Sequence, residues 1–198
     1  MSAKAVSFSP PPETAIASPR NVAQGFADHL NAVLNSTVSD ARLSVLSRPY
    51  SATRFLVACV QDARPVPLAL HGSALRLYVE HEVDASEDTA HTASYRYVLQ
   101  AEGAHDSWLV RWEYLRDQPA DYPYTLGHVH VHADFADAPR SVSHMKALPR
   151  LHLPTARVAL ELVLGHVIAE WGARPKTDAW RGILDDSLVG FEERWTAP

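Results

Sequence analysis

The sequence predicts an α+β fold: an antiparallel β-sheet meander of five to six strands, with an N-terminal helix and two C-terminal helices packed on it. Three observations lead to this prediction. Apolar residues recur at helical spacing near both ends of the chain. Between about Ser73 and Phe135 they alternate with polar residues, as on strands with one buried face. The connections between these alternating runs are short and polar, which favours hairpins.

The N-terminal helix is expected over residues 21–34, where Ser18-Pro19 supplies a cap and a first-turn proline. Two strands are expected next, at 42–47 and 53–60, with a turn at Pro49 between them. The alternating region supplies four more strands, at about 75–80, 95–99, 108–114 and 126–135.

Two helices close the chain. The first is expected over 155–171, with Thr155 as its cap and Gly172 directly after its end. Arg157 and Glu161 lie four residues apart in this segment and are expected to form a helical ion pair. Thr177 is then expected to cap the second helix, from Asp178 to about Arg194.

Composition narrows the class of protein. The chain has 198 residues, which suits one domain at 19–198, and the proline-rich residues 1–18 are expected to form a disordered or loosely docked arm. We expect a cytoplasmic protein with no membrane partner, because no long apolar stretch or signal peptide is present and Cys59 is the only cysteine. A formal net charge of −5 predicts weak overall attraction to nucleic acid.

The stretch "GHVHVHADF" places His128, His130 and His132 on alternate positions of one predicted strand. Residues i and i+2 of a strand lie about 6.5–7 Å apart on one face, so two neighbouring imidazoles can share a metal ion but all three cannot. A third ligand would come from a neighbouring segment, such as Glu113, Asp134 or His152. This pattern predicts a metal-dependent hydrolase with a divalent transition metal as cofactor, as one of three alternatives.

The same region also suits acid–base chemistry without a cofactor. His128, His130 and His152 are candidates for proton transfer, and Arg96 and Arg111 for binding phosphate. His152 is predicted to lie near the start of the helix at Thr155, where a helix N-terminus attracts anions. Other candidates for substrate binding are Tyr95, Tyr97 and Glu113. The alternative for the arginines is a solvated sheet face, and for the aromatic residues ordinary core packing.

Three motifs occur in the order found in one bacterial family. "YRYVLQ", "DSWLVRWEYLRDQP" and "YPYTLGHVHVHADF", followed by "LHLPTARVALELVLGHVIAEW", resemble the TumE-like toxins of bacterial toxin–antitoxin loci over roughly residues 75–171. Tyr95-Arg96-Tyr97, Arg111-Trp112-Glu113 and His128-Val129-His130-Val131 carry the resemblance. The Asn-Ala-Pro-His that often follows the second motif in the family is here Leu115–Pro119, without a histidine. The whole chain also resembles uncharacterised actinobacterial proteins, which implies a cytoplasmic setting.

The resemblance implies a toxin of a toxin–antitoxin or phage-defence locus that cleaves or binds RNA, with an antitoxin protein as partner. On this hypothesis the enzyme is a ribonuclease that needs no metal. A non-catalytic protein-interaction module on the same fold is the first alternative, and the net negative charge favours it. The metal-dependent hydrolase is the second. The oligomeric state is left open.

Overall fold

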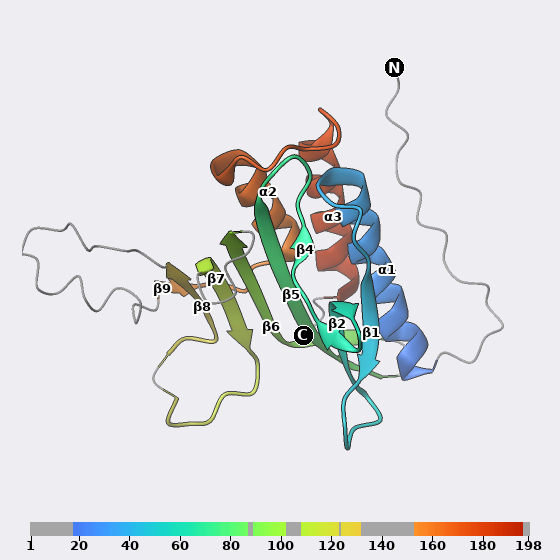
Figure 1. The fold of residues 1–198 in the computed structure, drawn as a ribbon. Coiled ribbons are helices and arrows are strands. Elements are labelled where there is room, and N and C mark those ends of the chain that lie inside the picture. Colours follow the sequence, from blue (N-terminus) through green and yellow to red (C-terminus); the bar gives the residue numbers. More distant parts are fainter. Residues whose placement is uncertain (1–17, 87–88, 102–107, 123, 132–152, 196–198) are drawn as a thin grey trace, which may run out of the picture.

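The computed structural model describes residues 18–86, 89–101, 108–122, 124–131 and 153–195. Within these ranges an N-terminal helix, a large antiparallel sheet and two C-terminal helices form the predicted α+β arrangement (Figure 1). The elements are α1 (Pro19–Thr37), β1 (Leu43–Ser47), β2 (Arg54–Gln61), β3 (Arg64–Pro65), β4 (Leu68–Ala69), β5 (Leu75–Ala85), β6 (Ala90–Ala101), β7 (Trp108–Leu115), β8 (Gly127–Val131), β9 (Leu153–Thr155), α2 (Leu160–Trp171) and α3 (Trp180–Trp195). The proposed arm at 1–18 lies almost wholly outside the described residues.

The sheet is a meander in the order β1-β2-β5-β6-β7-β8-β9, with β3 added beside β2 and β4 beside β5. All neighbouring strands in the described residues pair antiparallel. The described residues thus contain nine strands instead of the predicted five to six, because the short β3, β4 and β9 also pair. The hairpin between β5 and β6 is tighter than predicted, since the two strands run to Ala85 and from Ala90.

Helix α1 has the predicted cap, begins two residues earlier than predicted and ends three residues later. The Ser18 side chain accepts a hydrogen bond from the Asn21 backbone N–H at 3.3 Å, and Pro19 occupies the first turn. The buried face of α1 includes Phe26 and Leu30, which belong to the core beneath the sheet. This face, not helix propensity, supplies most of the stability of the helix in the folded protein.

The predicted start of the first C-terminal helix at Thr155 is wrong. Thr155 lies in β9 and pairs with Gly127, so its backbone belongs to the sheet, and α2 begins only at Leu160. Arg157 therefore precedes the helix, so the predicted placement of Arg157 and Glu161 four residues apart in one helix is wrong too. The helix ends at Gly172 with φ 72°, the left-handed conformation expected there. Thr177 does cap the turn that leads into α3, accepting from the Ala179 N–H at 3.3 Å.

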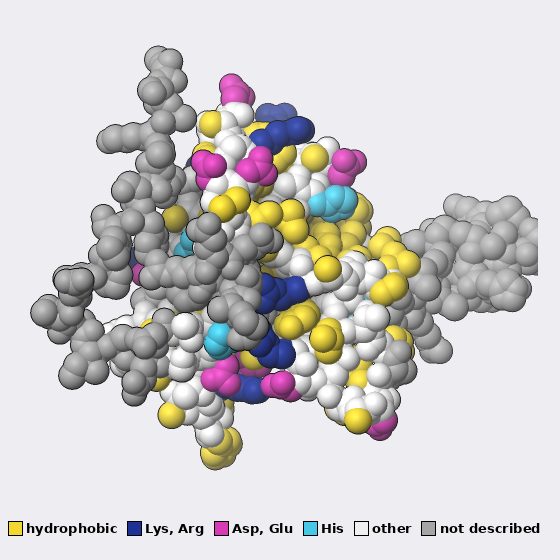
Figure 2. Space-filling model, turned by 180° about the vertical axis from the view of Figure 1, so that it is seen from behind, with side chains coloured by type: hydrophobic (Ala, Val, Ile, Leu, Met, Phe, Trp, Pro, Cys, Tyr) yellow, Lys and Arg dark blue, Asp and Glu magenta, His cyan; other side chains and the backbone are white. Residues whose placement is uncertain are grey.

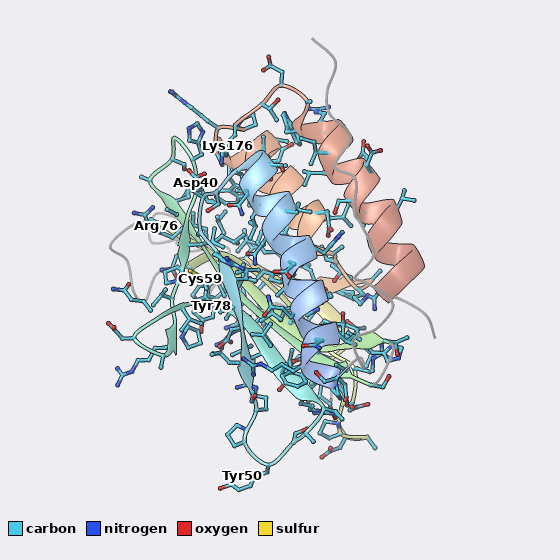
Figure 3. The ribbon with its side chains drawn as sticks, turned by 90° about the vertical axis from the view of Figure 1, so that its right-hand side faces the viewer. Asp40, Tyr50, Cys59, Arg76, Tyr78 and Lys176 are labelled. Carbon is cyan, nitrogen blue, oxygen red and sulfur yellow. The ribbon has the colours of Figure 1, made fainter. Side chains whose placement is uncertain are left out.

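All three helices lie on one side of the sheet, as Figure 3 shows from the edge. On β5 the buried Leu77 and Val79 face these helices, while Arg76 and Tyr78 lie on the other side of the sheet (Figure 3). We call this other side the helix-free face. On β6, β7 and β8, too, successive side chains point alternately to the core and to the helix-free face. The strand registers place residues of the same face next to each other on neighbouring strands.

Seen from the side of the helices, the surface carries gathered hydrophobic side chains between charged ones (Figure 2). Among the helices of the described ranges, none is long and apolar enough to span a membrane.

The half-buried Cys59 packs against the core, and burial raises the pKa of its thiol. This agrees with a structural cysteine rather than a nucleophile.

Gly127 is expected to be essential for the last strand pair. A Cβ atom there would lie 2.8 Å from the Ala156 carbonyl oxygen and 2.9 Å from that of Thr155, and both are backbone atoms that cannot rotate away. Gly127→Ala should therefore push β9 from β8 and destabilise the fold by about 1–3 kcal/mol in chemical denaturation. Gly25→Ala is the control, since a Cβ at Gly25 meets nothing within 4 Å, and it should be neutral or stabilising. An unchanged midpoint for Gly127→Ala would contradict the packing described.

Candidate metal centre on the helix-free face

Strands β7 and β8 bring the candidate residues together. Their antiparallel register places Glu113 opposite His128 and Arg111 opposite His130. Because side chains alternate along a strand, all four residues lie on the helix-free face, while Val129 and Trp112 between them face the core. The predicted pair His128 and His130 therefore has Glu113 as its third partner, one of the three candidates expected from the sequence.

The three side chains converge on one point. The Nε2 atom of His128 lies 3.5 Å from Glu113 Oε2, and the Nε2 atom of His130 lies 3.0 Å from the same oxygen. All three of these potential ligand atoms lie within 4.8 Å of one another. Both imidazoles are buried, at 4% and 2% exposed, and Glu113 is partly exposed. We call these three residues the His–Glu cluster.

The hydrogen bonds of the imidazoles indicate which nitrogen carries the proton. His128 Nδ1 lies 3.2 Å from the Thr125 carbonyl oxygen, which can only accept, so Nδ1 must donate and Nε2 keeps its lone pair. His130 Nε2 lies between a donor and an acceptor: Arg111 Nη2, which can only donate, is 3.3 Å away, and Glu113 Oε2, which can only accept, is 3.0 Å away. Two imidazole nitrogens and one carboxylate oxygen thus face each other, an arrangement that a cation between or beside them would satisfy.

The positively charged guanidinium of Arg111 lies directly beside the cluster. Its Nε atom lies 3.2 Å from Glu113 Oε2, in addition to the contact of Nη2 with His130. The guanidinium also lies over the ring of Trp108, 5.1 Å from its centre, and the edge of Trp108 meets His130. Trp108 therefore holds both Arg111 and His130 in place.

Two of the three ligand separations in the cluster are close to those of a metal site. Around a tetrahedral zinc ion with bonds of about 2.0–2.2 Å, neighbouring ligand atoms lie about 3.3–3.5 Å apart. The separations of 3.0 and 3.5 Å from Glu113 Oε2 are close to this spacing. The Thr125 carbonyl that orients His128 is the kind of outer partner that metal-binding histidines usually have.

A cavity of about 220 Å³ opens beside the cluster, with Glu113 and His128 in its wall. Its two guanidinium groups are already matched by carboxylates: Arg48 contacts Glu82 at 2.8 Å, and Arg96 contacts Glu80 at 2.6 Å. Apolar and aromatic side chains complete the wall, among them Leu56, Leu115 and Tyr122.

The remaining predicted site residues are distributed as follows. Arg96 shares the face and lies opposite Glu113 in the register, but its guanidinium is engaged by Glu80. Tyr95 and Tyr97 are wrong as base-stacking residues, because they point to the core and are 3% and 0% exposed. The Tyr95 hydroxyl accepts from the Val158 N–H at 2.6 Å, and burial raises the pKa of Tyr95 to about 12. His132, Asp134 and His152 lie outside the described residues.

Two contributors were not expected from the sequence. Thr125 acts through its backbone carbonyl, which no side-chain pattern reveals, and Trp108 reads as an ordinary strand aromatic. Comparison with protein-family models, with curated proteins and with solved structures finds no match to this chain.

Proposed function

We propose that this protein binds a divalent transition metal ion through Glu113, His128 and His130 and is a metal-dependent hydrolase. The observation that carries the proposal is the convergence of two imidazole nitrogens and one carboxylate oxygen within 4.8 Å of one another. Two histidines and one carboxylate are a ligand set of catalytic zinc sites, which keep a fourth position for water or substrate.

The protein residues have defined tasks in such a site. Glu113 supplies the only negative charge among the three ligands, and His128 is held in its ligating tautomer by the Thr125 carbonyl. A metal ion in this position would supply a water nucleophile at neutral pH and polarise the bond that is attacked. The cavity beside Glu113 and His128 offers the space for the substrate.

Removal of a ligand is expected to abolish metal binding. Glu113→Gln and His130→Ala should each weaken Zn²⁺ binding by more than about 100-fold, since even loss of an outer partner commonly costs 10–100-fold. Isothermal titration with Zn²⁺ and metal analysis, on protein purified without a His-tag column, measure the effect. Glu170→Gln and His71→Ala are matched controls, because both residues are exposed and lie outside the cluster. Wild-type protein that takes up less than about 0.1 equivalent of Zn²⁺, Ni²⁺, Mn²⁺ or Fe²⁺ would contradict the proposal.

A second candidate function is favoured by the contacts of Arg111. The guanidinium, Glu113 and the two imidazoles also offer the cation, base and acid that cleave RNA without a metal, as the resemblance to TumE-like toxins implies. Expression of His130→Ala beside wild type, with RNA integrity followed in the presence and absence of EDTA, separates the two. RNA cleavage and growth arrest that survive EDTA and require His130 would support the toxin. Equal growth and intact RNA with both proteins would remove it.

A further inference from the structure

Metal binding by the His–Glu cluster would change the surroundings of Arg111. The guanidinium now rests on two acceptors, Glu113 Oε2 at 3.2 Å and His130 Nε2 at 3.3 Å. Both atoms are ligands in the proposed function, and a coordinated imidazole nitrogen has no lone pair left to accept a hydrogen bond. Arg111 would therefore lose its hydrogen bond to His130 and share Glu113 with a stronger cation.

With a divalent metal ion bound, the His–Glu cluster and Arg111 together would carry a net positive charge. A divalent ion and Arg111 contribute three positive charges, the two coordinated imidazoles are neutral, and Glu113 removes one. Among the described residues, the other charged side chains that line the neighbouring cavity compensate each other in pairs, Arg96 with Glu80 at 2.6 Å and Arg48 with Glu82 at 2.8 Å. The side chains of Arg111 and Glu113 are only 29% and 26% exposed, so solvent screens this excess of positive charge incompletely.

From this imbalance we infer that the loaded cluster binds an oxyanion, the phosphate or carboxylate group of a small substrate, between the metal ion and Arg111. The inference rests on the proposed function. A guanidinium presents two parallel N–H donors that match two oxygens of such a group. Trp108 keeps the guanidinium beside the cluster when its present partners are withdrawn, because the ring contact at 5.1 Å does not depend on them.

The surroundings favour one small anionic group over a polyanion. Both guanidinium groups that line the neighbouring cavity are paired with carboxylates, so they do not extend the positive charge of the loaded cluster. The chain as a whole carries a formal net charge of −5. A long phosphodiester chain would therefore gain attraction at the cluster only, while the uncharged part of a small substrate can occupy the cavity.

Titration of the Zn²⁺-loaded, desalted protein with inorganic phosphate and with acetate tests the inference. Wild type should bind at least one of the two anions, and at least tenfold more weakly when the metal has been removed. Arg111→Gln should still take up Zn²⁺ but bind the anion at least tenfold more weakly, and Arg111→Lys, which keeps the charge and loses the fork, should be intermediate. Arg54→Gln is the control, because Arg54 pairs with Asp84 and Asp117 outside the cluster. Circular dichroism confirms that each variant is folded.

The outcomes separate the two claims. If wild type takes up no metal ion, the proposed function fails and the oxyanion site fails with it. If Zn²⁺ binds with full affinity but neither anion does, or if Arg111→Gln binds anions as tightly as wild type, the oxyanion site is wrong and the metal centre stands. The tighter of the two anions identifies the substrate group as phosphate or carboxylate.

Discussion

Replacing Glu161 by alanine is expected to lower the free energy of unfolding by about 2–4 kcal/mol, from lost buried hydrogen bonds and the cavity left behind. Glu161 is 1% exposed, at the start of α2. Its Oε1 atom accepts from the Ser187 hydroxyl of α3 at 2.9 Å and lies 3.2 Å from Nε2 of His29 on α1. One carboxylate thus ties all three helices together on the core side of the sheet.

These three residues do not form a catalytic triad. A relay would need Ser187 and Glu161 on opposite nitrogens of the imidazole, whereas both lie next to Nε2 of His29, at 3.1 and 3.2 Å. The serine also donates directly to the carboxylate. The arrangement is therefore structural, and its removal should affect stability and not metal binding.

Urea denaturation of Glu161→Ala measures the loss, and Glu170→Ala, an exposed glutamate of the same helix, is the matched control. Glu161→Gln keeps an oxygen that can accept from Ser187 and should lose less. A double-mutant cycle with Ser187→Ala should give a coupling above about 0.5 kcal/mol. If the stability losses of Glu161→Ala and Ser187→Ala simply add in the double mutant, the hydrogen bond between these two residues contributes no coupling energy.

Acidification is expected to destabilise the fold through His81. This residue of β5 is 2% exposed, with Nδ1 at 2.7 Å from the Tyr97 hydroxyl and Nε2 at 2.9 Å from the Thr92 hydroxyl. Burial, and next the charge of Arg157, lower the pKa of His81 from its ordinary 6.5 to about 3. The same burial raises the pKa of Tyr97, so this tyrosine stays protonated and can serve the imidazole as a partner.

The sign of the effect follows from the lowered pKa. The unfolded chain takes up a proton on His81 as the pH falls below about 6.5, and the folded protein does so only near pH 3. Stability from this residue is therefore complete above pH 6.5 and is lost progressively towards pH 3, by about 2–3 kcal/mol between pH 7 and pH 4.5.

Denaturation of wild type and His81→Gln at pH 7 and pH 4.5 isolates this contribution, because all other titrating groups are common to both proteins. The variant should lose about 2–3 kcal/mol less than wild type over this interval. His71→Ala, which changes an exposed histidine, should behave like wild type. Identical pH dependences of His81→Gln and wild type would contradict this prediction, because they would show that His81 takes up its proton as readily in the folded protein as in the unfolded chain.

Much of the site was predictable because a meander pairs consecutive strands. The alternation in 108–114 and 126–135 indicated which residues share a face, and neighbouring strands in the chain became neighbours in the sheet. Glu113 could therefore be named as a third ligand beside His128 and His130. Alternation does not reveal which face the helices cover, however, and this is why substrate binding and core packing both stayed open for Tyr95 and Tyr97, which the structure buries.

The start of α2 shows a second kind of limit. Thr155 is a good capping residue and precedes an apolar run, so local preference favoured a helix from there. In the folded protein the backbone of Leu153–Thr155 pairs with β8, which has no other described partner on that side. A long-range strand pair thus overrode the local signal, as tertiary contacts often do.

By itself, the sequence determined the α+β class, the order of the main elements and the two-sided character of the strands, because hydrophobic periodicity reports directly which backbone geometry can bury its apolar side chains. Only the tertiary structure decided the register, which sets Glu113 opposite His128 and Arg111 opposite His130. It also decided the partners of both imidazoles, a carbonyl beside His128 Nδ1 and a guanidinium beside His130 Nε2, which come from other parts of the chain. A ligand set is a matter of distances between atoms, and those distances exist only once the strands have paired.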